Sequence, residues 1–411
     1  MTRSTYGIAE LMSDFPREEY IARWERTRAS MEKEKIDGML LAKADDIAYF
    51  AGWRRFVDYS SAYLLLPRKG DPVLVAPHNQ KRIIEVVSPV EDVRYFGPSR
   101  LGFSDLTQTG LKALKELDFA DKVIGLEANP QVAEQTTWDS WTKSHLKKTK
   151  EIDELIWKIR MLKSTLEMRY IRAVSDITCK AYTKALSEVR EGMTERELTR
   201  ILYRTMIDEG AFDSPLRGFA HVAGASKYGM HDARATDYKF QKKDIILLNA
   251  GTTYRGYWSD IARLICIGPP SKRQKELFEA SLEAHLAGLE MLQPGMKISD
   301  VCRAIRAVIE KRGMVKNMGI FSGTDWFGHT FGLEVHERPE LVPTSPDSDI
   351  VLEPGMVFTM EPALCDDPIL ESELKEYKPG GEGYFFVEDN VLVTENGPEN
   401  LTTIPRELYV V

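Results

Sequence analysis

The sequence predicts a chain of two domains: an α/β domain over residues 1–157, followed by an α+β domain over residues 158–411 that contains an internal duplication. Three observations support this organisation. A chain of 411 residues exceeds what a single hydrophobic core usually organises. Short β-rich runs alternate with helical segments in the first part of the chain. In the second part, two segments resemble each other when the chain is compared with itself.

The first part of the chain opens with a helical pattern and continues with short apolar runs. Ile21, Trp24 and Met31 recur at helical spacing after Pro16, a residue suited to a first helical turn. Four β-rich runs follow, with helical stretches between them: GMLLAKA, AYLLLP, PVLVA and KVIGLE. This alternation is typical of an α/β domain, and about 150 residues is an ordinary domain size.

Longer helical segments begin at Glu151. Ser164 is followed three positions later by Glu167, which is a capping-box signature and predicts a helix that runs towards Leu186. We therefore place the domain boundary near Lys158.

The internal repeat lies beyond this boundary. REGMTERELTRILYRTMIDEGA resembles QPGMKISDVCRAIRAVIEKRGM, about 103 positions later. Each segment has a Gly-Met pair, a polar helix cap (Thr194 or Ser299), an amphipathic helix and a terminal glycine (Gly210 or Gly313). A duplicated unit of helix and strands would pack about a pseudo-twofold axis, which would bring polar residues of both halves to a common centre.

Four side chains in the strand segments of this region could meet at that centre: Asp260, His329, Glu361 and Glu388. Three carboxylates and one imidazole suit a divalent Mn, Fe, Co or Zn ion. Taken singly, acids at strand ends usually face solvent, and a histidine in a Gly-His pair is usually structural. Asp260 and Glu361, however, lie in apolar stretches where a buried charge needs a partner.

Composition excludes several classes of protein. With 55 basic and 63 acidic residues and a formal charge of -8, the chain has no basic surface for nucleic acid or anionic membranes, so a small molecule or peptide is the expected ligand. The four cysteines are widely spaced, which argues against a disulfide framework or a thiolate zinc site. No apolar run approaches the ~18 residues of a membrane span, and the N-terminus has no signal-peptide core. We expect a cytoplasmic protein.

Five motifs, in order, resemble the creatinase / Xaa-Pro peptidase family, which includes prolidase and aminopeptidase P: GMHDAR, LLNAGTTYRGYWSDIAR, GHTFGLEVHERP, LEPGMVFTMEP and VEDNVLVTENG. The resemblance covers nearly the whole chain. It implies a creatinase-type N-terminal α/β domain and a pita-bread catalytic domain with pseudo-twofold duplication.

In the metallopeptidases of that family, two aspartates, one histidine and two glutamates hold the metal. The resemblance places these ligands at Asn249, Asp260, His329, Glu361 and Glu388. Four are kept, and the first aspartate is replaced by its amide. Since a neutral amide oxygen attracts a cation less than a carboxylate does, we expect one tightly bound divalent ion and a second that is weak or absent.

The resemblance also implies an activity, which is hydrolysis of a C–N bond in an Xaa-Pro dipeptide or a small amino-acid-like substrate by metal-activated water. Glu361 would be the general base, and His231 and His336 would donate hydrogen bonds to the reacting group. Similar enzymes are dimers in which the region matching residues 50–60 reaches the partner's active site, and creatinase uses an arginine there for its substrate's carboxylate, so the resemblance implies a homodimer. Three arginines are candidates for this role, unless they only border solvated turns: Arg54, Arg55 and Arg338.

Two other function classes remain open. One is a different reaction on the same scaffold. Creatinase, a metal-free C–N hydrolase, also has asparagine at the Asn249 position, and a dimethylsulfoniopropionate lyase that resembles this family performs a metal-assisted elimination. Two residues after the Asp260 position creatinase has a glutamate, where this sequence has Ala262. The other class is a pita-bread protein that binds a partner without catalysis. Four retained ligands and both histidines argue against it.

Overall fold

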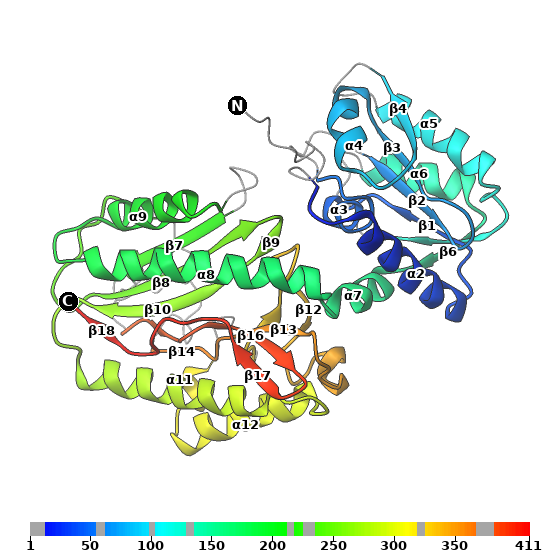
Figure 1. Ribbon diagram of the computed structural model, residues 1–411. Coiled ribbons are helices and arrows are strands. Elements are labelled where there is room, and N and C mark those ends of the chain that lie inside the picture. Colours follow the sequence, from blue (N-terminus) through cyan, green and yellow to red (C-terminus); the bar gives the residue numbers. More distant parts are fainter. Residues whose placement is uncertain are drawn as a thin grey trace. The chain divides into compact units, whose positions relative to one another are not determined.

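The computed structural model of the chain divides into two compact units, residues 1–160 and 161–411, which are described separately (Figure 1). The sequence places the boundary near Lys158. The structure describes residues 13–54, 62–97, 103–128, 135–211, 218–224, 235–318, 325–366 and 382–411.

The first unit is built on a six-stranded mixed sheet of order β4-β3-β2-β1-β5-β6. Strands β1, β2 and β3 are antiparallel neighbours, and the remaining neighbours pair in parallel. The strands are β1 (Gly38–Leu41), β2 (Tyr63–Pro67), β3 (Val73–Pro77), β4 (Asp92–Phe96), β5 (Val123–Leu126) and β6 (Lys148–Glu151). The helices are α2 (Arg17–Lys33), α3 (Ala44–Ala51), α4 (Lys81–Val87), α5 (Phe103–Glu116), α6 (Gln135–His145) and α7 (Asp153–Met161).

The four β-rich runs of the sequence form β1, β2, β3 and β5, as predicted. Every residue of β1, β2 and β3 is buried, as expected for strands covered on both faces. In the core, the ring of Tyr63 stacks on Trp141 with centroids 5.3 Å apart. Burial of these apolar runs drives formation of the unit.

The second unit repeats one order of elements, two helices followed by antiparallel strands. The first half contains α8 (Thr165–Glu188), α9 (Glu195–Asp208), β7 (Gly218–Gly224), β8 (Ile245–Tyr254), β9 (Tyr257–Trp258) and β10 (Ile261–Cys266). The second half contains α11 (Lys272–Met291), α12 (Ile298–Lys311), β11 (His329–Thr330), β12 (Glu337–Glu340), β13 (Val357–Met360), β14 (Leu364–Cys365), β15 (Tyr384–Phe385), β16 (Asp389–Thr394) and β17 (Gly397–Asn400), and β18 (Tyr409–Val410) follows. Helix α8 packs on β8, α9 on β7 and α11 on β13 (Figure 1).

The strands of the two halves meet at β10 and β16. The first sheet has the order β18-β10-β8-β7, with β9 paired to β8, and the second has the order β12-β11-β13-β16-β17. An antiparallel bridge between Ala262 and Glu388 joins the two sheets. The Glu388 amide donates to the Ala262 carbonyl at 3.2 Å, and the Ala262 amide donates to the Glu388 carbonyl at 3.4 Å. The predicted duplication about a shared centre is therefore confirmed.

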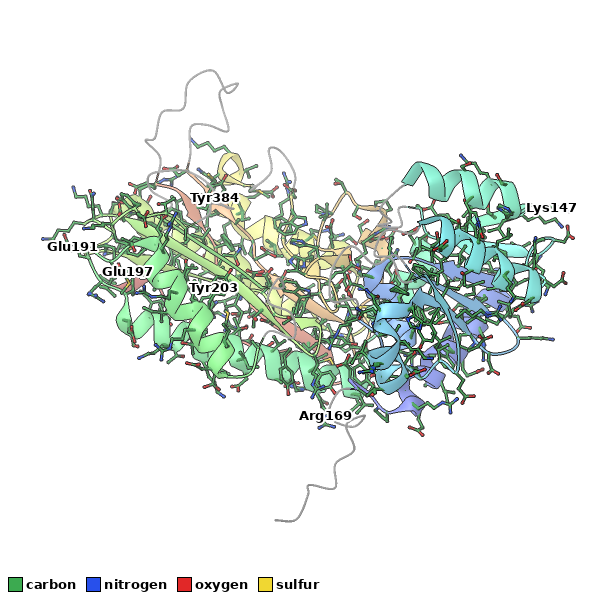
Figure 2. All side chains as sticks on the ribbon, turned by 90° about the horizontal axis from the view of Figure 1, so that it is seen from above. Lys147, Arg169, Glu191, Glu197, Tyr203 and Tyr384 are labelled. Atoms are coloured by element: carbon green, nitrogen blue, oxygen red, sulfur yellow. The ribbon has the colours of Figure 1, made fainter. Side chains whose placement is uncertain are left out.

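Capping boxes fix the starts of two helices of the first half. The Glu167 amide donates to Ser164 Oγ at 3.2 Å, and the Ser164 amide donates to Glu167 Oε2 at 2.8 Å, which confirms the predicted start of α8. Helix α9 begins in the same way with Thr194 and Glu197, the latter labelled in Figure 2. Each box satisfies backbone amides that the helix itself leaves unpaired.

The predicted cap of α12 at Ser299 is wrong. The helix begins at Ile298 and its N-cap is Lys297. The reason is that Asp300, in the first turn, accepts a hydrogen bond from the Lys297 amide at 3.3 Å, which sets the start of the helix before Ser299. The two terminal glycines behave as predicted: Gly210 and Gly313 take left-handed φ values of 94° and 67° just after their helices.

Candidate metal centre

Four predicted site residues lie at strand ends contributed by both halves of the second unit. Asp260 directly precedes β10 and Glu388 directly precedes β16, while Glu361 directly follows β13 and His329 begins β11. None of the four is more than 4% exposed. Because β10 and β16 are joined by the Ala262–Glu388 bridge, the carboxylates that precede them are held in the same region.

The spacing of these side chains suits ligands of one ion. His329 Nε2 lies 3.3 Å from Glu361 Oε1 and 3.9 Å from Asp260 Oδ2. Single ligand atoms of His329, Glu361 and Glu388 lie within 4.8 Å of one another. Two atoms that each lie about 2.1 Å from one ion are themselves about 3 to 3.5 Å apart at usual coordination angles.

The imidazole of His329 is oriented for coordination through Nε2. Its Nδ1 lies 2.9 Å from the Thr330 carbonyl oxygen and donates to it, so the lone pair is on Nε2, on the side of the carboxylates. The indole of Trp326 stacks on the ring, with centroids 5.5 Å apart and planes 19° apart. The ring is therefore held in one orientation.

Two residues of the cluster carry buried lone pairs that lack a hydrogen-bond donor among the described residues: His329 at Nε2 and Glu388 at both carboxylate oxygens. A buried carboxylate that accepts no hydrogen bond is costly, because it has lost its water without a replacement. A divalent cation would satisfy these oxygen and nitrogen atoms together. The residues present therefore fit such an ion.

The electrostatics of the centre agree with this fit. Burial raises the pKa of Glu388 well above its ordinary value, and the nearby charges of Asp260 and Glu361 raise it further. Burial alone would lower the pKa of His329, but the carboxylate of Glu361, 3.3 Å from Nε2, and the charge of Asp260 outweigh burial, and the pKa is raised. The carboxylates of the cluster therefore lie close enough to disfavour one another's charged form.

Asn249 lies on β8, paired in register with Ala262 of β10, and is 5% exposed. Tyr182 of α8, which the sequence analysis did not single out, fixes this strand pair. Its hydroxyl donates to the Leu248 carbonyl at 3.0 Å, accepts from the Ala250 amide at 2.9 Å and contacts the Ile261 carbonyl. Burial raises the pKa of Tyr182 well above its ordinary value. A helix-to-sheet contact of this kind has no local sequence signal.

Thr359 is a second residue that the sequence analysis missed. Its hydroxyl donates to Glu361 Oε1 at 2.7 Å and accepts from the His329 amide at 3.1 Å, so it orients both side chains. The sequence does contain a signal for this contact, because residues two positions apart in a strand face the same side of the sheet. Thr359 stands two positions before Glu361.

The other predicted site residues do not all lie at the cluster. His336, exposed, precedes β12, and its ring centroid lies 4.3 Å from that of His329. Arg54 contacts Asp14 Oδ1 at 2.8 Å within the first unit. Arg338 donates to both oxygens of Asp347, at 2.8 and 2.6 Å. The remaining two, His231 and Arg55, lie outside the described residues.

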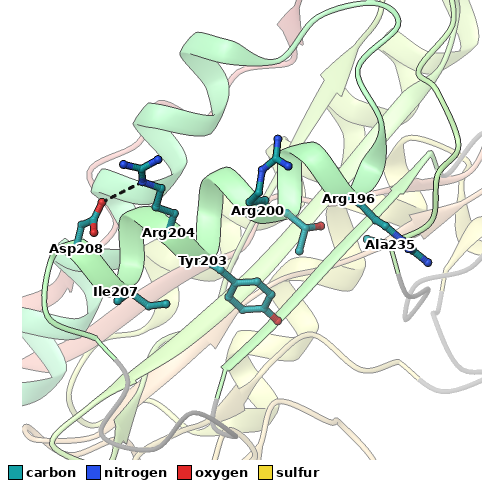
Figure 3. Close-up of a pocket in the computed structure, with 8 residues that line it drawn as sticks. Arg196, Arg200, Tyr203, Arg204, Ile207, Asp208 and Ala235 are labelled. Carbon is teal, nitrogen blue, oxygen red and sulfur yellow. Dashed lines mark ion pairs between the residues drawn. The ribbon is translucent and has the colours of Figure 1, made fainter.

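A cavity of about 550 Å³ lies along α9 and includes none of the clustered side chains (Figure 3). Within it, Arg204 pairs with Asp208 at 3.5 Å. The cavity is lined by Arg196, Thr199, Arg200, Tyr203, Arg204, Ile207, Asp208 and Ala235. It is therefore separate from the candidate metal centre.

A duplicated α+β domain in which both halves bring carboxylates and an imidazole to one buried point defines the pita-bread class of metallohydrolases. The chain belongs to metallopeptidase family M24, which residues 169–395 match. Residues 23–162 match the creatinase/prolidase N-terminal domain. The chain is accordingly a hydrolase with two domains, a creatinase-type domain and a pita-bread catalytic domain.

Individual relatives agree with this assignment. The chain is 27% identical over 384 residues to the Xaa-Pro dipeptidase of Pyrococcus horikoshii, covering 92% of this chain and 96% of that protein. It is 26% identical over 408 residues to the creatinase of a Bacillus species, covering 97% and 94%. The solved structure of an Xaa-Pro dipeptidase from Bacillus anthracis matches with a TM-score of 0.78 and 26% identity, covering 95% of this chain and all of that one.

Among the described residues, no helix is both long and apolar enough to cross a membrane.

Proposed function

We propose that the chain is a divalent-cation-dependent peptidase that hydrolyses Xaa-Pro dipeptides. The observation that carries this proposal is the convergence of His329 and Glu388, whose buried lone pairs accept no hydrogen bond among the described residues, with the carboxylates of Asp260 and Glu361. Relatives named Xaa-Pro dipeptidase, matched over most of both chains, support the substrate class.

Each clustered residue has a proposed role. A divalent Mn, Fe, Co or Zn ion, when bound, would supply Lewis acidity that lowers the pKa of a water and polarises the substrate carbonyl. Asp260, His329, Glu361 and Glu388 would hold it, with Asn249 as a weakened ligand. Glu361, oriented by Thr359, would take the proton of the water and return it to the leaving nitrogen. His231 and His336 would donate hydrogen bonds to the oxygen that gains charge.

The carboxylate of a dipeptide needs a cationic partner, for which Arg54, Arg55 and Arg338 remain the proposed residues. Arg338 has a side chain that is 48% exposed, and a substrate carboxylate would compete for its guanidinium with Asp347, which binds it bidentately. Replacing Arg338 with glutamine should raise the KM for a dipeptide and leave its kcat nearly unchanged.

The dimeric state and the cytoplasmic location of the protein also remain proposals. Light scattering on the purified protein would measure the mass in solution and so decide whether two copies associate.

Hydrolysis of an Xaa-Pro dipeptide series tests the proposed function, with the matching Xaa-Ala dipeptides as substrate controls. We expect cleavage before Pro that stops on chelation and returns when Mn, Co or Zn is added. The Glu361→Gln variant serves as the matched control for contaminating peptidases, and it should be inactive.

Three results would replace the proposal. Hydrolysis of creatine that survives chelation would indicate creatinase-like chemistry, which the asparagine at position 249 favours. Release of an alkene product without consumption of water would indicate a lyase. A protein that binds the cation but turns over none of these substrates would be a binding module.

A further inference from the structure

A second group of potential ligands overlaps the first. One ring nitrogen of His336, one of His329 and one carboxylate oxygen of Asp260 lie within 4.8 Å of one another. His329 and Asp260 already belong to the candidate metal centre. His336 comes from a different segment, the turn before β12, and is exposed where the other two are buried.

The relation between the two imidazoles matches that of ligands on one ion. Their ring centroids lie 4.3 Å apart, with ring planes at 62°. With nitrogen-to-ion distances of about 2.1 Å, two imidazoles bound at right angles to one ion have centroids roughly 4.5 Å apart. An edge-to-face ring contact would give a similar arrangement, so the experiment has to separate the two explanations.

The turn that carries His336 is held by a buried ion pair. Lys163 Nζ donates to Glu337 Oε2 at 3.0 Å, with the two side chains 1% and 6% exposed, and the Glu334 amide donates to Glu337 Oε1 at 3.3 Å. A Cβ on Gly332 would lie only 2.8 Å from Glu337 Oε1, so a larger residue there would displace this carboxylate. Because Glu337 is anchored, the neighbouring His336 is positioned beside His329 before any substrate arrives.

The ligand set of this chain explains why an additional metal-coordinating atom would strengthen cation binding. Asn249 supplies a neutral oxygen where a carboxylate would attract a cation more strongly. An imidazole adds a donor atom near Asp260 and His329 without adding more negative charge to a centre that already holds three buried carboxylates.

We propose that His336 is a cation ligand in the substrate-free protein and forms, with Asp260 and His329, a two-imidazole, one-carboxylate face of a single-ion site. The proposal rests on the proposed function, since it presupposes that the centre binds a cation. Two imidazoles shift preference towards Zn, Fe or Co and away from Mn, because nitrogen ligands suit the former ions better.

The test is cation binding without substrate. Isothermal titration of the metal-free protein with Zn²⁺ and with Mn²⁺ would compare the wild type, His336→Gln and a control, His78→Gln, which removes an exposed histidine of the first unit. We expect His336→Gln to weaken Zn²⁺ binding by at least roughly tenfold, to weaken Mn²⁺ binding less, and His78→Gln to change neither.

X-ray absorption of the zinc-loaded wild type provides a measurement that needs no variant. We expect two imidazoles in the coordination shell, and one in His336→Gln. A single imidazole in the wild type, or unchanged Zn²⁺ affinity in His336→Gln, would overturn the ligand assignment while leaving the proposed function standing. If the wild type binds neither ion, the proposed function fails, and the ligand assignment with it.

Discussion

Arg263 Nη2 lies 2.8 Å from Asp389 Oδ1, and both side chains are fully buried. Arg263 lies on β10, which Asp260 precedes, and Asp389 is the first residue of β16, directly after Glu388. This ion pair therefore joins the two strands beside the candidate metal centre. Arg263 also donates to the Glu388 carbonyl at 2.8 Å. Burial alone would raise the pKa of Asp389, but the hydrogen bond from His285 and the charge of Arg263 outweigh it and hold the pKa well below its ordinary value.

Replacing Arg263 with methionine should lower the free energy of unfolding by about 3 to 5 kcal/mol, because Asp389 would keep only Arg406 as a guanidinium partner and the buried carbonyls that Arg263 contacts would lose their donor. Urea denaturation measures the change. The control is Arg172→Met, which breaks a pair with Glu399 whose side chains are 44% and 41% exposed, and it should cost less than about 1 kcal/mol. Equal losses in the two variants would contradict the importance of the buried pair.

Removing the cation should lower the melting temperature of the protein, since the carboxylates of Asp260, Glu361 and Glu388 would face one another without a counter-charge. A cation at one hundred times its Kd contributes about 2.7 kcal/mol, which corresponds to roughly 5 to 10 °C for a unit of this size. Thermal denaturation with and without chelator measures the shift. In Glu388→Gln the shift should be much smaller. A shift of the same size there would show that the cation binds elsewhere.

Replacing Thr359 with valine should reduce kcat by roughly 10- to 100-fold, because Glu361 loses the hydroxyl that orients its carboxylate at 2.7 Å. The KM should change little. Thr394→Val is a matched control, since the Thr394 hydroxyl contacts its own turn and not the cluster: it donates to the Gly397 carbonyl at 2.7 Å and accepts from the Asn396 amide at 3.1 Å. Steady-state kinetics on one Xaa-Pro dipeptide would reveal the difference, and equal rates for Thr359→Val and wild type would remove Thr359 from the mechanism.

Replacing Asn249 with aspartate should allow a second cation to bind, because a carboxylate attracts a divalent ion more strongly than an amide does. Elemental analysis after dialysis against a fixed free-ion concentration should show about one ion per chain in the wild type and a higher value in the variant. Asn249→Ala controls for changes in packing and should stay near one. Unchanged stoichiometry in Asn249→Asp would show that Asn249 is not a weakened ligand.

Acid should destabilise the first unit in part through Asp37. The Val123 amide, 3.1 Å from Asp37 Oδ2, and then the guanidinium of Arg68 hold the pKa of Asp37 below its ordinary value. This stabilisation is present above the unfolded-state pKa of about 4 and is lost as the pH falls through the lower folded-state value. Urea denaturation between pH 3 and pH 7 should show wild type exceeding Asp37→Asn near neutrality and converging with it in acid. A difference that stays constant with pH would exclude this cause.

Local features of the chain were predictable because their physics is local. The capping box of Ser164 and Glu167 and the left-handed Gly210 involve neighbouring residues only. The apolar runs that form β1, β2, β3 and β5 predict buried strands. Strands β4 and β6 escaped prediction because they form the two edges of the sheet and carry polar residues, as in the exposed run Lys148–Glu151. The Ser299 cap failed because Asp300 competes for the same helix start.

The linear sequence determines the residue types of the candidate centre, including its single amide, and it contains the repeat that relates the two halves. These features depend only on composition and spacing. Only the tertiary structure determines which of these side chains are in contact. The Arg263–Asp389 pair joins segments that are far apart in the chain. The stack of Trp326 on His329 and the position of His336 beside His329 depend on how the side chains are oriented. Such contacts arise from the packing of whole strands and helices against one another, and no short stretch of sequence contains that information.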